Sequence, residues 1–326
     1  MAAAGRVGAL DGPAPRARPA AAGGVAAPVV RWAPVAAGRV PVTLRRAVAA
    51  DVAACARIVY DAFTAIGEAH RFPPSFPSLE AATRVSKFFI DLAAIWSLIA
   101  EHDGRPVGAV FVDEGDEIRG VALIAVDPAV QQRGIGRRLM EAALERTRGA
   151  AGVRLVQEAY NTLAMSLYAS LGFEVKEPLL RMTGRPRSAP RPGLEVRAFG
   201  PDRLEECARL CARVHGVDRS GDLRDAFGVF SPFAALRDGR IVAYTYAVFG
   251  GSLAWGVAES EADMRALLLG VAAATAAPLA LLVPTRQPSL LRWCLAEGLR
   301  AEKPLTLMAM GKYQEPQGCY FPSGIY

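Results

Sequence analysis

The stretch Val126-Asp-Pro-Ala-Val-Gln-Gln-Arg-Gly-Ile-Gly136 joins a valine-rich run to a segment with the composition of a helix, Arg137 to Thr147. Gly134 and Gly136 leave backbone N–H groups open to an anion, and the helix that follows adds the positive end of its dipole. The dinucleotide fingerprint G-x-G-x-x-G fails because Leu139 stands at its third glycine, and no G-x-x-x-x-G-K-[ST] occurs in the chain. The turn therefore predicts a pyrophosphate site of another kind, with a plain tight turn as the alternative.

A second motif follows one strand later. Val153 to Gln157 is a short apolar run, and it leads into Asn161-Thr-Leu-Ala-Met-Ser-Leu-Tyr-Ala-Ser-Leu-Gly-Phe173. This segment fits the pattern N-x-x-A-x-x-x-Y-x-x-x-G-F, and the glycine turn fits Q/R-x-x-G-x-G/A. The two motifs in this order resemble the GCN5-related N-acetyltransferase (GNAT) family over residues 43–183. The resemblance implies an α/β (α+β) fold, a mixed and mostly antiparallel sheet flanked by helices.

Length and charge bound the remaining possibilities. A chain of 326 residues suggests two domains. The net charge is +6, but residues 1–40 hold five arginines against one aspartate, so they contribute +4 and the rest of the chain only +2. A nucleic-acid-binding surface would need its basic residues on the folded part of the chain, which carries little net charge. We therefore expect no nucleic-acid partner. Residues 1–40 are rich in Ala, Pro and Arg without an apolar core of signal-peptide length, and we expect a disordered extension.

The cysteines and the longest apolar run argue against a metal and a membrane. The five cysteines form no CxxC pair and have no histidine at metal-ligand spacing, which predicts no metal and a reducing, cytoplasmic location. Ala266 to Val283 is almost wholly apolar, but Pro278 divides it. We expect a helix followed by a strand there and no membrane contact.

The chain contains a duplication. Three groups of residues recur in the same order, and the difference in residue number between the copies falls from 152 to 135 to 126. The pairs are Cys55-Ala-Arg57 and Cys207-Ala-Arg209, Asp103-Gly-Arg105 and Asp238-Gly-Arg240, and Leu171-Gly-Phe173 and Glu297-Gly-Leu299. We therefore predict a catalytic GNAT domain at 41–183, a linker at 184–193, a GNAT-like domain at 194–312 and an aromatic tail at 313–326. Both Asp-Gly pairs lie between apolar runs, which predicts two-residue hairpins. Each copy is expected to end in a strand pair.

The second copy has not kept the glycine turn. It carries Glu259, Glu261 and Asp263 where the first copy has Gln131 to Gly136. Carboxylates would repel a pyrophosphate, so we expect this domain to be a degenerate structural partner.

The resemblance implies acetyl-CoA as the acyl donor, bound in the first copy with no metal. The pyrophosphate is expected on the backbone of the glycine turn, and an N–H near Ala125 or Val126 is expected to hydrogen-bond the thioester oxygen. Arginines around the turn would add charge, and Asn161 would contact the coenzyme as well as cap its helix. The cofactor residues are Ala125, Val126, Gln131, Gln132, Arg133, Gly134, Ile135, Gly136, Arg137, Arg138 and Asn161.

In the same motif the tyrosine hydroxyl protonates the departing thiolate, which makes Tyr168 the expected general acid; a half-buried core tyrosine is the alternative. The general base is open between Glu158, at the end of its strand, and Glu117, at the start of the preceding one. A water relay is a further alternative. The acids 113, 114, 116 and 117 form a hairpin that would attract a cationic amine or, as charged hairpins generally do, face solvent.

Two segments are candidates for further roles. The loop that contains His70, Phe72 and Phe76 falls between the first two expected helices, where this family walls its acceptor site; a rigid connector is the alternative. The tail after Tyr313 is rich in aromatics, so we expect it to dock on the body or at a dimer seam. Its sequence does not decide between monomer and homodimer.

These features predict an N-acyltransferase that moves an acetyl group from acetyl-CoA to the primary amine of a small molecule. A mycothiol-synthase-like acetyltransferase is an alternative within this class. A non-catalytic acyl-CoA sensor is the alternative outside it.

Overall fold

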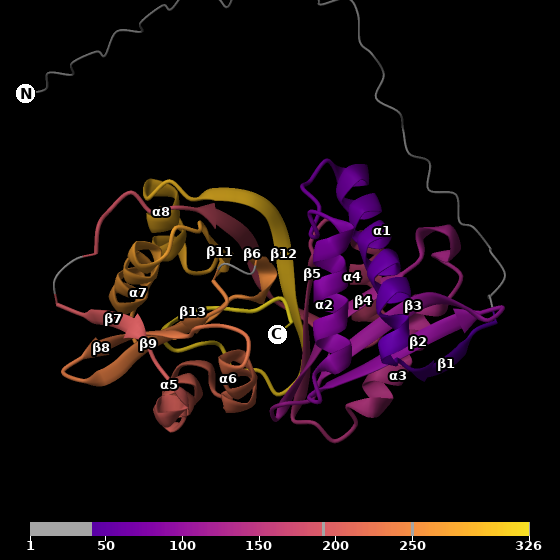
Figure 1. Cartoon of the computed structure of the whole chain (residues 1–326), viewed down its shortest axis with the longest axis horizontal. Helices are drawn as coiled ribbons and strands as arrows, with labels where there is room; N and C mark the ends of the chain where they lie inside the picture. The colour runs from indigo at the N-terminus through magenta and orange to yellow at the C-terminus, as the bar shows by residue number, and fades with distance from the viewer. Residues whose placement is uncertain (1–40, 191–192, 249–250, 326) are drawn as a thin grey trace, which may run out of the picture. The chain divides into compact units, whose positions relative to one another are not determined.

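Two sheets organise the part of the chain that the computed structural model describes, residues 41–190, 193–248 and 251–325. The predicted extension 1–40 lies outside the described residues. The eight-stranded sheet has the order β1-β2-β3-β4-β5-β12-β6-β11, and the five-stranded sheet the order β13-β10-β9-β8-β7. Among the strand pairs within these described ranges, only β4 and β5 run parallel. Mixed, mostly antiparallel sheets flanked by helices confirm the predicted fold class (Figure 1).

The first copy alternates strands and helices as the motifs predict. Its elements are β1 (Thr43–Arg46), η1 (Ala49–Asp51), α1 (Val52–His70), α2 (Leu79–Asp91), β2 (Ile95–His102), β3 (Arg105–Asp113), β4 (Ile118–Val126), η2 (Pro128–Val130), α3 (Ile135–Arg146), β5 (Gly152–Glu158), α4 (Thr162–Ser170) and β6 (Glu174–Gly184). Side chains along β3 alternate: Ala109 and Phe111 pack with α1 and α2, whereas Val110 and Val112 pack with α3 and α4. The sheet is thus covered on both faces.

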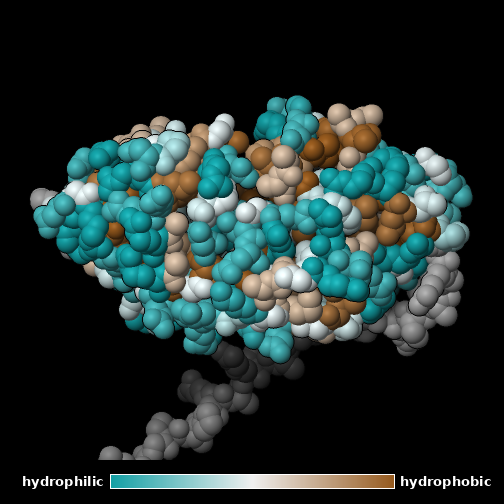
Figure 2. Space-filling model, turned by 90° about the horizontal axis from the view of Figure 1, so that it is seen from below, coloured by the Kyte–Doolittle hydropathy of each residue, from teal (hydrophilic) through white to brown (hydrophobic). Residues whose placement is uncertain are grey.

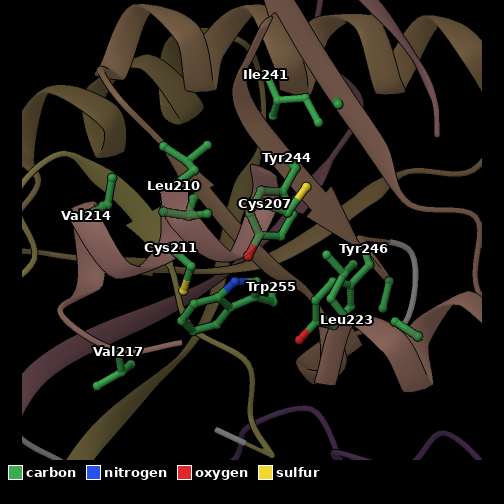
Figure 3. Packing of buried hydrophobic residues seen from close by; sticks show 14 of the residues in the cluster. Cys207, Leu210, Cys211, Val214, Val217, Leu223, Ile241, Tyr244, Tyr246 and Trp255 are labelled. Atoms are coloured by element: carbon green, nitrogen blue, oxygen red, sulfur yellow. The ribbon is translucent and has the colours of Figure 1, made fainter. Parts of the chain in front are cut away.

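The second copy repeats this order of α-helices and strands and adds a last strand, β13. Its elements are β7 (Glu195–Ala198), η3 (Pro201–Arg203), α5 (Leu204–His215), α6 (Ser220–Phe227), β8 (Phe233–Arg237), β9 (Arg240–Tyr246), η4 (Gly251–Leu253), β10 (Trp255–Ala258), α7 (Glu261–Ala274), β11 (Leu279–Pro284), α8 (Pro288–Ala296), β12 (Arg300–Gly311) and β13 (Cys319–Phe321). Figure 3 shows one of its cores, in which Cys207 and Cys211 of α5 lie close to Tyr244 and Trp255. Both cysteines are buried and free, so they serve packing.

Both Asp-Gly pairs form the tight turns that the sequence predicts. Asp103 and Gly104 have φ of 49° and 73°, and Asp238 and Gly239 have φ of 51° and 76°. Positive φ at both central residues is the signature of a type I′ hairpin turn, whose twist matches that of the flanking strands. These turns join β2 to β3 and β8 to β9.

The ends of the two copies differ from the prediction. The prediction that each copy ends in its own strand pair is wrong. Strand β12 of the second copy lies between β5 and β6 of the first, and β11 pairs with β6 (Figure 1). The exchange is reciprocal: Leu179 faces Leu305, which is its own equivalent at the shift of 126. The two predicted domains therefore share one continuous sheet.

The apolar run from Ala266 to Val283 divides as predicted. Helix α7 ends at Ala274 and β11 begins at Leu279, on either side of Pro278. Throughout the described ranges, no helix has both the length and the apolarity needed to cross a membrane. The face drawn in Figure 2 carries its apolar residues in several groups separated by polar ones.

Candidate active site

The parallel strands β4 and β5 pair only at their beginnings. Ile118, Arg119 and Gly120 pair with Gly152, Val153 and Arg154, although the two strands continue to Val126 and Glu158. Beyond the paired residues the strands diverge, as the resemblance to the GNAT family implies. Two cavities lie along the diverging ends.

The first cavity has a volume of about 480 Å³ and lies over the glycine turn. Phe63 and Ile66 of α1 line it opposite that turn. Nine of the eleven predicted cofactor residues line it: Ala125, Val126, Gln131, Gln132, Gly134, Ile135, Gly136, Arg137 and Asn161. The sequence motif therefore corresponds to one continuous wall.

The backbone of the turn leaves donors available. Gly134 is the N-cap of α3 with φ of 87°, and no side chain caps the helix there. The first N–H groups of α3 have no partner within the helix, so they can bind an anion. Gln132 also has positive φ, 61°, and the side-chain amide of Gln131 donates to the Val126 carbonyl oxygen at 2.9 Å. That hydrogen bond ties the turn to the end of β4.

Two predicted arginines are not part of the cavity wall. Arg138 donates to the Val42 carbonyl oxygen at 2.8 Å, and exposed Arg133 lies outside the cavity lining. Their contact with the cofactor therefore stays a prediction, and both lie outside the cavity lining. Arg137 lines the cavity and donates to Ser170 Oγ at 2.6 Å.

A second cavity, of about 440 Å³, lies behind the first. Residues of α2, β4, β5 and the loop before α2 line it, together with Gly324 and Ile325 near the chain end. Six residues line both cavities: Phe63, Ile124, Glu158, Asn161, Ala164 and Tyr168. Two compartments thus meet at one carboxylate and one phenol.

Tyr168 and Asn161 lie on α4 and at its start. The Asn161 side chain accepts a hydrogen bond from Ala164 N at 3.1 Å and caps the helix, as predicted. Burial raises the pKa of the Tyr168 phenol well above its usual value. The phenol is therefore protonated at neutral pH and able to donate a proton.

Glu158 is held by residues that the motifs did not indicate. Its Oε1 accepts hydrogen bonds from Ser75 Oγ at 2.5 Å and from Lys303 Nζ at 2.8 Å. Glu158 and Lys303 are buried, and Ser75 is partly buried. Burial lowers the pKa of Lys303, against the opposing effect of Glu158. Lys303 belongs to β12 of the second copy, so no local pattern in the first copy could have pointed to it.

Glu117 is wrongly predicted as a base. It precedes β4, eight residues before Ala125, which at about 3.3 Å per residue places it about 26 Å away. It pairs with Lys312 at 2.9 Å. The neighbouring acids are also engaged: Glu114 pairs with Arg146, and Asp116 accepts hydrogen bonds from the first amides of α6. The acidic hairpin therefore does not face the cavities.

The loop between α1 and α2 contributes one predicted aromatic residue to the second cavity. Phe76 lines it and packs edge-on against Phe63, with ring centroids 5.3 Å apart. Phe72 instead stacks on Tyr160 at 4.4 Å, and exposed His70 lies 5.3 Å from the same ring. The predictions for these two residues are corrected: they brace Tyr160 and do not line either cavity.

The equivalent turn of the second copy is closed by its own side chains. Ser260 caps α7 by accepting from Asp263 N at 3.2 Å, and Asp263 pairs with Arg237. Glu259 pairs with Arg213 and Arg240. An anion at this turn would meet carboxylates already bound to arginines, in contrast to the uncapped α3.

Comparison with known proteins agrees with this geometry. Residues 93–175 match the model of a family described as the acetyltransferase (GNAT) domain. Mycothiol acetyltransferase of Clavibacter michiganensis subsp. michiganensis is 32% identical over 192 residues, which are 52% of this chain and 62% of that protein. The chain spans less than two thirds of the length of the curated relatives that it matches.

Solved structures resemble nearly the whole described chain. A putative acetyltransferase from Pyrococcus horikoshii has a TM-score of 0.68 and 19% identity, covering 85% of this chain and 93% of that one. A tandem GNAT protein from the clavulanic acid biosynthesis pathway has a TM-score of 0.53 and 12% identity, covering 86% and 99%. These likenesses concern the fold. The chain therefore carries a GNAT acetyltransferase domain, within two sheet-and-helix units that have the fold of tandem GNAT proteins.

Proposed function

We propose that the protein is an N-acetyltransferase that uses acetyl-CoA to acetylate the primary amine of a small molecule. The observation that carries this proposal is the meeting of two cavities at Glu158 and Tyr168. One cavity has the glycine turn at its wall and suits the donor. The other lies on the opposite side of the shared residues and suits the acceptor. Holding both reactants in one geometry is worth on the order of 7–11 kcal/mol of the barrier.

Glu158 and Tyr168 each have a step in direct transfer. The amides at the start of α3 bind the pyrophosphate, and a backbone N–H near Ala125 or Val126 polarises the thioester carbonyl. Glu158 takes a proton from the acceptor ammonium, so that the neutral amine attacks the carbonyl carbon. The tetrahedral intermediate then expels the thiolate of coenzyme A, which takes the proton of Tyr168. The remaining excess proton on the attacking nitrogen passes to the Tyr168 phenolate and restores it, so that the amide is neutral.

Lys303 and Ser75 position the base in this scheme. Both contact Oε1 of Glu158, which fixes the carboxylate at the junction of the cavities. The second copy thereby takes part in the first copy's site without binding a cofactor of its own. This explains why a degenerate domain is useful to the enzyme.

A mycothiol-synthase-like acceptor is the second candidate. The curated relatives named mycothiol acetyltransferases favour it. It belongs to the same reaction class, because an amine is again the nucleophile. An acceptor panel that includes cysteine-derived amines separates it from other small amines.

Two measurements test the proposal. Acetyl-CoA should raise the Tm in proportion to RT ln(1 + [L]/Kd). Addition of a suitable amine should release one thiol per acetylated product. An acyl-CoA sensor would show the rise in Tm with acetyl-CoA, but it would release no thiol with any amine. Absence of both effects would contradict the acetyltransferase proposal itself.

A further inference from the structure

Strand β13 occupies the place in the second copy that the diverging strands leave open in the first. The correspondence follows from strand register. Ala109 faces Ala125 between β3 and β4, and 135 residues further along Tyr244 faces Val257 between β9 and β10. Val257 is therefore the equivalent of Ala125, and Ala258 the equivalent of Val126.

In the second copy these positions are bound by protein. Tyr320 of β13 pairs with Val257, and Cys319 pairs with Ala258, in antiparallel register. The backbone that in the first copy faces the proposed donor cavity here forms a sheet ladder. The other flank of β13 contacts β11, the equivalent of β5. A strand thus fills the gap between the two equivalents of β4 and β5.

A side chain equivalent to Asn161 clamps this strand. At the shift of 126 Asn161 corresponds to Gln287. The Gln287 amide donates to the Tyr320 carbonyl oxygen at 2.6 Å and accepts from Tyr320 N at 3.3 Å. In the first copy the same position lines the donor cavity.

Packing fixes β13 in place. Tyr320 and Phe321 are buried, and a Cβ on Gly256 would come within 2.3 Å of the Phe321 ring. A side chain at position 256 would therefore clash with this ring. His215 also packs against Tyr320, with ring centroids 5.0 Å apart.

The residues after β13 run back to the first copy. Ser323 Oγ donates to the Leu253 carbonyl oxygen at 3.3 Å, and Gly324 N donates to the Ser252 carbonyl oxygen. Ile325 then packs against the core formed by α1 and α2 of the first copy. With Phe63 and Phe76 it lines the second cavity. The strand that fills one site thereby supplies a wall to the other.

We propose that β13 permanently fills the second copy's cofactor slot and that Ile325, held by it, determines which acceptors the first copy takes. The proposal rests on the function proposed above. Ile325 meets the apolar part of the acceptor, while Glu158 and Tyr168 meet its amine. The site thus selects amines whose apolar body fits between the tail and the aromatic residues of the α1–α2 region.

Ile325→Ala and Ile325→Trp test the acceptor role, with straight-chain primary alkylamines of increasing length as probes. The smaller side chain should raise the ratio of kcat/KM for long amines to kcat/KM for short amines by about tenfold, because a few methylene groups of the longer amines then fit where the isoleucine side chain stood. The larger one should lower the same ratio. KM for acetyl-CoA should not change, and Leu295→Ala, on an exposed leucine of α8, is the matched control.

Unchanged amine selectivity in both Ile325 variants would overturn the acceptor role. If the unmodified protein acetylates no amine, the proposed function fails and the role of Ile325 fails with it. The filled slot is decided separately, by measurements that need no activity.

Calorimetry should show one acetyl-CoA site per chain, and hydrogen exchange should show protected amides at residues 319–321 with and without acetyl-CoA. Gln287→Leu removes the clamp at similar volume and should speed exchange at those amides, while a control, Gln317→Leu, should not. Two acetyl-CoA sites, or fast exchange at 319–321 in the unmodified protein, would overturn the filled slot. No acetyl-CoA binding together with protected amides would sink the proposed function and leave the filled slot standing.

Discussion

Lys303 Nζ lies 2.8 Å from Glu158 Oε1, and the two residues come from different copies of the duplication. The contact exists because β12 crosses into the first copy's sheet, where Leu305 pairs with Glu158 itself. Both side chains are almost completely buried. The exchange of strands therefore brings Lys303 to Glu158, the carboxylate at which the two cavities meet.

Lys303→Met should destabilise the protein by about 3–5 kcal/mol, because it leaves the Glu158 carboxylate buried without its cation. Urea denaturation measures the change. The double variant Glu158→Gln/Lys303→Met should be more stable than Lys303→Met alone, since the uncompensated charge is then gone. A loss below about 1 kcal/mol in Lys303→Met would show that the pair is solvated.

Lys303 also illustrates what the sequence could and could not predict. The glycine turn, the Asp-Gly hairpins and the helix cap at Asn161 are local patterns, and each was predicted from residues close together in the chain. The repeat predicted two similar copies. It did not predict which copy the last strands join, because an exchanged pairing buries the same apolar faces as an internal one.

The errors at the site have the same origin. Glu117 and Glu158 are both next to strands, and only the direction of β4 and β5 places one of them at the junction and the other at the far end. Ser75 and Ile325 belong to a loop and a chain end without a motif. Their roles depend on tertiary contacts alone.

Tyr168→Phe should lower kcat by about 10²–10⁴, the usual range for loss of a general acid, with KM for acetyl-CoA little changed. The phenol is buried and its pKa is raised, so it keeps its proton through the neutral range. Tyr60→Phe, at a partly buried tyrosine of α1 that lines neither cavity, is the comparison variant. Equal loss in both variants would mean that Tyr168 acts only through packing.

Gly134→Ala should abolish the rise in Tm with acetyl-CoA. Gly134 has φ of 87° and is the N-cap of α3, so an alanine costs about 1–2 kcal/mol of strain, and relief of that strain should displace the amides that bind the anion. Gly149→Ala is a matched control, because Gly149 has φ of 90° with open space around it and is not part of the cavity lining. Both variants should lose similar stability, and only Gly134→Ala should lose binding. Preserved binding in Gly134→Ala would contradict an anion site at this turn.

The stability of the whole protein should fall on acidification through His215. Burial, and then the charges of Arg154 and Arg219, lower the pKa of His215 well below 6.5. Arg154 Nη1 lies 3.1 Å from His215 Nε2, so this nitrogen is the acceptor and the ring is neutral.

The sign of this effect follows from proton uptake. Below the unfolded pKa of about 6.5 the unfolded chain binds a proton at His215 that the folded protein does not. The stabilising effect is therefore complete above pH 6.5 and is lost as the pH falls, by up to about 1.4 kcal/mol per pH unit while the folded ring stays neutral. Urea denaturation between pH 7.5 and 5 measures it. His215→Gln should flatten this part of the profile, because glutamine carries no titrating group. Equal slopes in the two proteins would assign the acid sensitivity to other groups.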